Sequence, residues 1–251
     1  MIERAFYSVL SQTVSPEEII LVEDCSNDEG KTLSVLNRLK EECNEKISVK
    51  ILMQKSNQGP SAARNIGWKA AQMPYIAFLD ADDAWDPRKI EIQYEWMSQH
   101  PDVTLSCHRS ARLFGDQFTS ESVALSKCIP IKGWKLLLSD IIATRSVMIK
   151  RDIPFRFPED KRYTEDYFLW LQIILKGYKA WYLDAVLCYS YDSKEGNNNL
   201  SSHLWKMEMG ELDTYKRLYN DKLLPFCSLF VLFPWSLFKY IRRVFMRFLG
   251  L

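Results

Sequence analysis

Short apolar runs and amphipathic segments alternate along the first half of the chain. A run such as EIILVE (Glu18–Glu23) has the length and composition of a buried strand, whereas Leu33–Cys43 repeats its leucines at the spacing of one helical stripe. The pattern predicts strands at Glu18–Glu23, Ile47–Met53, Tyr75–Leu79 and Val103–Cys107, and helices at Ile2–Gln12, Leu33–Cys43, Ser61–Gln72 and Pro87–Gln99. This alternation favours an α/β fold with a mixed, mainly parallel sheet between layers of helices.

The second half of the chain follows a less regular pattern. It predicts helices at Gly133–Ile142 and Glu165–Lys176 and a further helix ending at Tyr219, with strands at Thr144–Lys150, Lys179–Tyr182 and Val186–Tyr191 and a loop at Lys194–Ser202. We see no repeat and no linker between domains. We therefore expect one domain over residues 1–220 and a separate C-terminal segment over residues 221–251.

That C-terminal segment has the character of a membrane-surface helix. Leu223–Phe238 carries no charge but is interrupted by Pro225 and Pro234, and it is shorter than the roughly 20 residues of a spanning helix. Beyond it, basic and apolar side chains separate onto two helical faces. The basic face holds Lys239, Arg242, Arg243 and Arg247, and the apolar face holds Ile241, Val244, Phe245 and Phe248. Such a helix suits an anionic membrane surface, the alternative being a helix packed on the core.

Composition narrows the classes of protein. With 251 residues, 47% of them hydrophobic, the chain can bury a large core. The net charge of +1 and the absence of a block of like charges give no reason to expect a nucleic-acid partner. The six cysteines are scattered without a CxxC pair, which favours free thiols in a reducing compartment. The charged, amphipathic start MIERAFYSVL does not resemble a signal peptide, so we expect a cytoplasmic location.

An acidic cluster follows the predicted strand Tyr75–Leu79. Asp80, Asp82 and Asp83 come directly after its apolar residues, where open α/β sheets place their ligands. In extended backbone Asp80 and Asp82 would project from the same face. Two carboxylates there suit a hard divalent ion that also holds the phosphates of a ligand. Helix capping explains Asp86, and it could explain Asp83, but it does not explain Asp80.

Three further polar groups accompany strand ends or helix starts. Glu23 and Asp24 stand at the end of EIILVE, where a carboxylate could bind a base or ribose, although Asp is also a common turn former. Gly59 and Arg64 lie in NQGPSAARNIG (residues 57–67), where a helix N-terminus and a guanidinium could meet a phosphate, or where the turn could simply feed a packing helix. Glu165 and Asp166 open a strongly apolar helix, either as favourable first-turn acids or as a general base.

Together these segments resemble a known family. FLDADD, NQGPSAARNIGWKAA and TEDYFLWLQ, preceded by SVLSQTVSPEEIILVEDCSND, look like glycosyltransferase family 2, whose members have the GT-A fold. The resemblance covers roughly Ile2 to Tyr191 and is nearest to bacterial enzymes that build O-antigen and other surface polysaccharides. It implies an inverting transfer from a nucleotide sugar, with a UDP-sugar as the expected donor, to a lipid-linked saccharide, with Mn²⁺ or Mg²⁺, at the inner face of the cell membrane.

The resemblance also implies roles for individual residues. The nucleotide sugar would contact Asp24, Asn57, Arg64 and Asp80. Asp82, assisted by Asp80, would hold the metal ion through the diphosphate. Asp166 would be the catalytic base, with Glu165 beside it. We expect most aromatic residues to lie in the core, and Trp85, next to the acidic cluster, to be available for stacking on a sugar.

One departure from the family keeps other functions open. Family members usually begin with an apolar strand of the form SVIIPxYN, just before the helix that starts here near Ile2, and this sequence does not show it. Without it, the neighbouring strands would expose unpaired backbone. The alternatives are therefore a truncated, inactive family member or a sugar nucleotidyltransferase. The latter would normally carry a Gly-rich, Lys/Arg-containing loop near its start, which this chain lacks.

Overall fold

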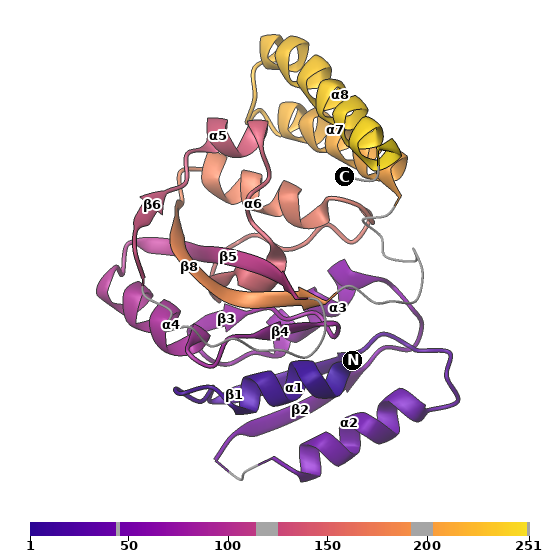
Figure 1. Cartoon of the computed structure of the whole chain (residues 1–251), viewed down its shortest axis with the longest axis vertical. Coiled ribbons are helices and arrows are strands. Elements are labelled where there is room, and N and C mark those ends of the chain that lie inside the picture. The colour runs from indigo at the N-terminus through magenta and orange to yellow at the C-terminus, as the bar shows by residue number, and fades with distance from the viewer. Residues whose placement is uncertain (44–45, 114–124, 192–202, 250–251) are drawn as a thin grey trace. The chain divides into compact units, whose positions relative to one another are not determined.

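The computed structural model describes residues 1–43, 46–113, 125–191 and 203–249, which form two compact units (Figure 1). The first unit consists of Met1–Ile131, Ile142–Pro154 and Lys179–Asp192, and the second of Lys132–Ile141, Phe155–Tyr178 and Ser193–Leu251. The expected loop at Lys194–Ser202 lies outside the described residues.

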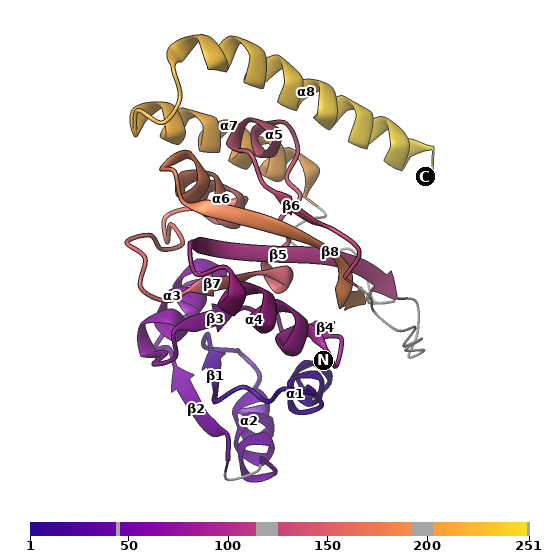
Figure 2. The same ribbon diagram turned by 90° about the vertical axis from the view of Figure 1, so that its left-hand side faces the viewer.

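The first unit opens with a small parallel sheet between helices. Its elements are α1 (Ile2–Leu10), β1 (Glu18–Glu23), α2 (Lys31–Glu41), β2 (Ser48–Met53) and α3 (Pro60–Ala70). β1 and β2 pair in parallel along their full length. Phe6 of α1 and Leu39 of α2 share a buried cluster with Ile19 of β1, while α3 packs on the opposite face of β1 (Figure 2). The predicted strand, helix, strand, helix order is confirmed here.

A larger sheet completes the first unit. It contains β3 (Tyr75–Ala77), β4 (Asp83–Trp85), β5 (Val103–Leu113), β6 (Cys128–Pro130), β7 (Met148–Lys150) and β8 (Lys179–Tyr191), with α4 (Lys89–Gln99) and a 3₁₀ turn (Thr144–Ser146). The strand order is β3-β7-β5-β8-β4, and β6 also pairs with β8. β5 and β8 are parallel and the other pairs of this sheet are antiparallel. Because the two longest ladders, β1–β2 and β5–β8, are parallel, the predicted mixed α/β fold is confirmed.

Two local expectations were wrong, and the short strand β4 was missed. The two short strands predicted between Lys179 and Tyr191 are one strand, β8, whose irregularity is absorbed by register shifts opposite β5. β4 was not predicted, because three residues carry no periodicity and this strand exists only by pairing with β8. Of the predicted strand Thr144–Lys150, only Met148–Lys150 is extended. The N–H and hydroxyl of Ser146 both bond the carbonyl of Ala143, which closes the 3₁₀ turn instead.

The second unit is helical. It contains α5 (Gly133–Leu138), α6 (Glu165–Leu175), α7 (Leu204–Asn220) and α8 (Phe226–Phe248). α6 is its centre, with Leu169, Trp170, Leu171 and Ile173 fully buried. The Tyr167 hydroxyl of α6 donates to the carbonyls of Leu136 and Leu137 at the end of α5, at 3.0 and 3.1 Å.

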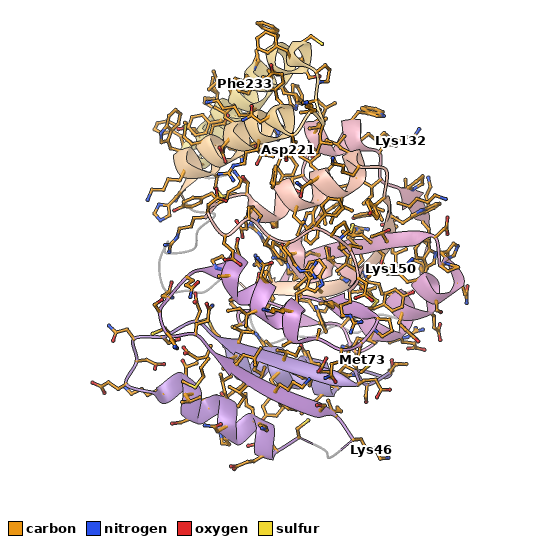
Figure 3. All side chains as sticks on the ribbon, turned by 180° about the vertical axis from the view of Figure 1, so that it is seen from behind. Lys46, Met73, Lys132, Lys150, Asp221 and Phe233 are labelled. Carbon is orange, nitrogen blue, oxygen red and sulfur yellow. The ribbon has the colours of Figure 1, made fainter. Side chains whose placement is uncertain are left out.

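α8 packs beside α7 and carries Pro234 within it. Phe233, labelled in Figure 3, lies 6.4 Å from the ring of Tyr215 of α7. Two residues of the predicted basic face of α8 turn toward α7. Lys239 bonds Glu211 and Arg243 bonds Glu208, both on α7. Among the helices of the described ranges, none is both long enough and apolar enough to cross a bilayer.

Candidate active site

Asp24 ties the end of β1 to the turn that starts α3. Its Oδ1 accepts hydrogen bonds from Nε2 of Gln54 and the N–H of Gln58, both at 2.8 Å, and its Oδ2 accepts the N–H of Gly59 at 2.7 Å. Asn57 donates its side-chain amide to the Asp24 carbonyl at 2.9 Å. Gly59 has a φ of +87° and a ψ of 177°, a conformation that essentially only glycine adopts. Two predicted binding residues, Asp24 and Asn57, are thus brought together, and these bonds leave one lone pair on Oδ2 for a further donor.

Arg64 and Asp80 form the second part of the site. Nη2 of Arg64, on α3, lies 2.9 Å from Oδ1 of Asp80, and only 15% of the arginine side chain is exposed. The two predicted residues therefore meet as an ion pair. This pair fixes the Asp80 carboxylate beside α3 and presents a positive charge where a diphosphate could lie.

The acidic cluster does not have the extended geometry that we expected. β3 ends at Ala77, and the N–H of Asp83 bonds the carbonyl of Asp80 at 3.1 Å. Residues 80–83 therefore form a turn, and the argument that Asp80 and Asp82 share one face of a strand was wrong. The turn separates their roles, because Asp80 engages Arg64 whereas Asp82 is exposed.

Asp82 has a carboxylate that could bind a metal ion only together with other ligands. Among the described residues its carboxylate accepts no hydrogen bond and no ion pair, while Nη2 of Arg4 donates to its carbonyl at 2.8 Å. The Arg4 guanidinium also lies 3.4 Å over the ring of Tyr191 at the end of β8, so α1 and β8 both hold this turn. Nowhere in the described part of the chain do three or more His, Cys, Asp or Glu side chains gather as a metal cage. One exposed carboxylate fits Mg²⁺ or Mn²⁺ only where phosphate oxygens and water complete the shell.

Buried groups lie beneath the turn, and sequence reasoning missed their arrangement. Asp83 is buried, with Arg145 Nη1 3.4 Å from its Oδ2, and burial raises the pKa of Asp83 to about 7. Trp85 is only 5% exposed and donates Nε1 to the Arg145 carbonyl at 2.9 Å, so the expectation that it could stack on a sugar was wrong. The sequence offered one reason to single out Asp83, because it belongs to the acidic cluster. It offered no reason to single out Arg145, which lies far away in the sequence and in no recognisable motif.

Glu165 and Asp166 open α6 in the second unit. Glu165 is buried and Asp166 is half-buried, with its Oδ1 accepting the N–H of Tyr167 at 2.8 Å. Thr164 holds the N-cap position at φ +55° but makes no capping bond through its side chain, which lies 3.3 Å from Oγ1 of Thr214. The first unit carries the nucleotide and metal candidates, and the second carries the candidate base.

The comparisons with known proteins identify the family. The family model described as glycosyl transferase family 2 matches residues 1–153. The chain belongs to glycosyl transferase family 2. As a family member it is 32% identical, over 82% of its own length and 78% of the relative's, to the putative teichuronic acid biosynthesis glycosyltransferase TuaG of Bacillus subtilis.

This family 2 chain is also similar to another curated glycosyltransferase and to two solved structures. It is 32% identical to the UDP-Glc:alpha-D-GlcNAc-diphosphoundecaprenol beta-1,3-glucosyltransferase WfaP of Escherichia coli, over 69% of this chain and 64% of that protein. Among solved structures, the mannosyltransferase PcManGT from Pyrobaculum calidifontis, in complex with GDP-Man and Mn²⁺, matches with a TM-score of 0.67. That match spans 96% of this chain and 69% of the other at 16% identity, so it shows the shared GT-A fold. The chain spans 61% of another matching structure, residues 1–349 of TarS from S. aureus.

Proposed function

We propose that this family 2 glycosyltransferase moves a sugar from a UDP-sugar to a lipid-linked saccharide, with inversion, in the synthesis of a bacterial surface polysaccharide. The observation that carries the proposal is the exposed carboxylate of Asp82, which has no partner within the described ranges and follows the Arg64–Asp80 pair by two residues. This is the arrangement that a metal-bridged diphosphate would complete. The names of TuaG and WfaP support the class of acceptor and pathway, and that of WfaP supports a UDP-sugar.

The donor would be held by the first unit. The remaining lone pair of Asp24 Oδ2 can accept the imide N–H of a uracil, and Arg64 can share its charge between Asp80 and a phosphate. Asn57 would act by holding Asp24 in place. Asp82, with Asp80 near it, would hold Mn²⁺ or Mg²⁺, which when bound neutralises charge on the departing diphosphate.

The acceptor would be activated by the second unit. Asp166 would take the proton of the acceptor hydroxyl as that oxygen attacks the anomeric carbon and the bond to the diphosphate breaks. The sugar carbon gains oxocarbenium character in this step. Glu165, buried beside it, would orient the acceptor side of the site. A single displacement inverts the anomeric centre and needs no covalent enzyme intermediate.

The test is calorimetric binding of UDP with and without Mn²⁺, on the wild-type chain and on Asp82→Ala. We expect Mn²⁺ to strengthen UDP binding at least tenfold in the wild type and to have no effect in Asp82→Ala. Asp102→Ala is the matched control, because Asp102 lies on the surface of the same unit, paired with Lys179, and such pairs contribute little. Equal metal-dependent binding by wild type and Asp82→Ala would refute the role of Asp82.

We also infer a peripheral membrane contact through α8, at the cytoplasmic face. Its exposed face carries Phe230, Phe245 and Phe248, which are 69%, 59% and 86% exposed. All six cysteines are free, which supports a reducing compartment. Since Lys239 and Arg243 pair with α7, the apolar side chains would supply most of the affinity and Arg242 part of the charge.

Sedimentation with vesicles of phosphatidylglycerol tests this contact. The double variant Phe230→Ser, Phe245→Ser should bind at least tenfold more weakly, since each buried phenylalanine contributes about 1.5–3 kcal/mol. Met53→Ser, which changes an equally exposed apolar residue on β2, should bind as the wild type does. Unchanged binding by the double variant would exclude α8 as the contact.

A further inference from the structure

Arg145 lies on the larger sheet of the first unit and has no role in the reaction proposed above. Its Nε donates to Oγ of Ser110 on β5 at 2.8 Å, and its Nη1 lies 3.4 Å from Oδ2 of Asp83 on β4. The side chain is 27% exposed, and within the described residues its Nη2 has no partner. Arg145 therefore keeps N–H donors for a molecule that is not part of the chain.

The guanidinium of Arg145 lies across β8, between the two strands that flank it (Figure 1). Asp83 of β4 pairs with Ser190 of β8, and Ser110 of β5 pairs with Cys188 of β8. Ser190 and Cys188 are two residues apart, so the side chains of Asp83 and Ser110 leave the same face of the sheet. β5 and β8 are parallel, and Ser110 and Ser190 lie near their carboxyl ends, where α/β sheets place ligands.

Buried neighbours fix the backbone of Arg145. Its carbonyl accepts Nε1 of Trp85 at 2.9 Å, and the residue lies in the 3₁₀ turn that Ser146 closes onto Ala143. Ser146 is fully buried, and its carbonyl accepts Nε2 of Gln93 on α4 at 3.0 Å. A side chain that is held at both its backbone and its guanidinium loses little freedom when it binds a ligand, which is a condition for selective recognition.

Asp83 connects Arg145 with the candidate metal ligand. Asp83 directly follows Asp82, and its carboxyl group interacts electrostatically with those of Asp80 and Asp82. In the proposed function, Asp82 holds a metal ion on the diphosphate of the donor. The transferred sugar is bonded directly to that diphosphate, so it is the part of the donor that comes next to Asp83 and Arg145. The inference drawn from this geometry rests on the proposed function.

The charges around Arg145 favour a neutral ligand. Asp83 compensates the guanidinium, and Asp80 and Asp82 add negative charge nearby. A phosphate bound to Arg145 would be repelled by these carboxylates. A sugar hydroxyl is uncharged and both donates and accepts hydrogen bonds, so it can accept from Nη2 of Arg145 and donate to Oγ of Ser190, which lies on the same face of the sheet.

We propose that Arg145 contacts the hydroxyls of the transferred sugar and selects which UDP-sugar this glycosyltransferase accepts. Asp83 is a positioning residue, since it holds the guanidinium and compensates its charge. A sugar with a hydroxyl within reach of Nη2 gains a hydrogen bond to a charged group, whereas its epimer leaves that donor unpaired. Such a bond changes affinity by about tenfold or more.

Calorimetry on the full chain in the presence of Mn²⁺ tests the proposal. The probes are UDP, UDP-glucose, UDP-galactose, UDP-N-acetylglucosamine and UDP-N-acetylgalactosamine, whose sugars differ at C2 or C4. We expect the wild type to bind one UDP-sugar at least tenfold more tightly than another. Arg145→Gln should reduce this ratio to less than about threefold and change the affinity for UDP less than about twofold. An unchanged ratio would overturn the proposal. An equal loss of affinity for UDP and for every UDP-sugar would also overturn it, because Arg145 would then contact the diphosphate.

Arg109→Gln is the matched control. Arg109 is an exposed arginine of β5 that pairs with Asp184, and its replacement should keep the wild-type ratio. If Arg145→Gln does not fold, because Asp83 is then buried without its cation, the double variant Arg145→Gln, Asp83→Asn removes both charges and takes its place. A wild type that binds UDP but does not distinguish the four sugars would overturn the role of Arg145 alone. A wild type that does not bind UDP would instead overturn the proposed function on which this role rests.

Discussion

Lys89 is buried with no counter-charge among the residues that the structure describes, and its replacement by methionine should stabilise the chain. Lys89 is 0% exposed at the start of α4, its Nζ lies 3.9 Å from the ring centroid of Trp85, and within the described residues Nζ has no hydrogen-bond partner. Burial lowers the pKa of Lys89 from 10.5 to about 7. Methionine is similar in length, carries no charge and can contact the indole through its sulfur.

The magnitude follows from the linkage between pKa and folding. A base whose folded pKa lies below its unfolded pKa destabilises the fold fully below the folded value, and this cost disappears as the pH rises through the unfolded value. For Lys89 the cost is about 4 kcal/mol at pH 7 and falls below about 2 kcal/mol by pH 9.5. The contact with Trp85 offsets about 2 kcal/mol of it while the lysine is charged. We therefore expect Lys89→Met to gain about 2–3 kcal/mol at pH 7 and about 1.5 kcal/mol at pH 9.5, where the lysine is neutral and the contact with Trp85 offsets nothing.

Urea unfolding of wild type and Lys89→Met at the two pH values measures this difference. Far-UV circular dichroism and tryptophan fluorescence should give coincident transitions before free energies are compared. His108 and Cys188 interact electrostatically with Lys89, but burial lowers the pKa of His108 to about 3 and raises that of Cys188. Lys179→Met, at an exposed lysine, is the control and should change stability little at either pH. A wild type at least as stable as Lys89→Met at pH 7, or a gap that does not shrink by pH 9.5, would refute the reasoning.

Three other variants probe the site and the helical unit. Arg4→Ala removes the bond to the Asp82 carbonyl and should weaken Mn²⁺-dependent UDP binding by about three- to tenfold, since a lost hydrogen bond costs about 0.5–1.5 kcal/mol. Arg64→Lys keeps the charge but loses the planar fork, and calorimetry should show UDP affinity falling at least fivefold while the melting temperature changes little. Gly210→Ala places a Cβ 2.9 Å from the Tyr163 carbonyl, and thermal unfolding should report a loss of about 1–3 kcal/mol.

Matched controls accompany these variants. Arg38→Ala removes an exposed arginine that pairs with Glu3 and Glu42, and it should leave UDP binding unchanged where Arg4→Ala weakens it. Met209→Ala changes a half-exposed neighbour of Gly210 and should not lower the melting temperature as Gly210→Ala does. An undiminished affinity in Arg4→Ala, or an unchanged melting temperature in Gly210→Ala, would contradict the assigned contacts.

Much of the layout was predictable because periodicity is a local property. The strands β1 and β2 and the helices α1, α2, α3 and α6 lie within a few residues of their predicted ranges. The order of the four polar motifs predicted the family, which the match to residues 1–153 confirms. The predictions that failed concern segments that are short or whose conformation depends on pairing with another strand. β4 is extended only because β8 pairs with it, and residues 80–83 turn because β4 must begin three residues after Asp80.

The sequence by itself determined which residues could do chemistry here. The carboxylates of Asp24, Asp80 and Asp82 and the guanidinium of Arg64 stand in motifs that can be read without a structure. Only the tertiary structure decided what each is free to do. It commits Asp24 to the turn before α3 and Asp80 to Arg64, and it leaves Asp82 exposed. These outcomes depend on contacts between residues far apart in the chain, and the spacing of residues along a sequence does not contain them.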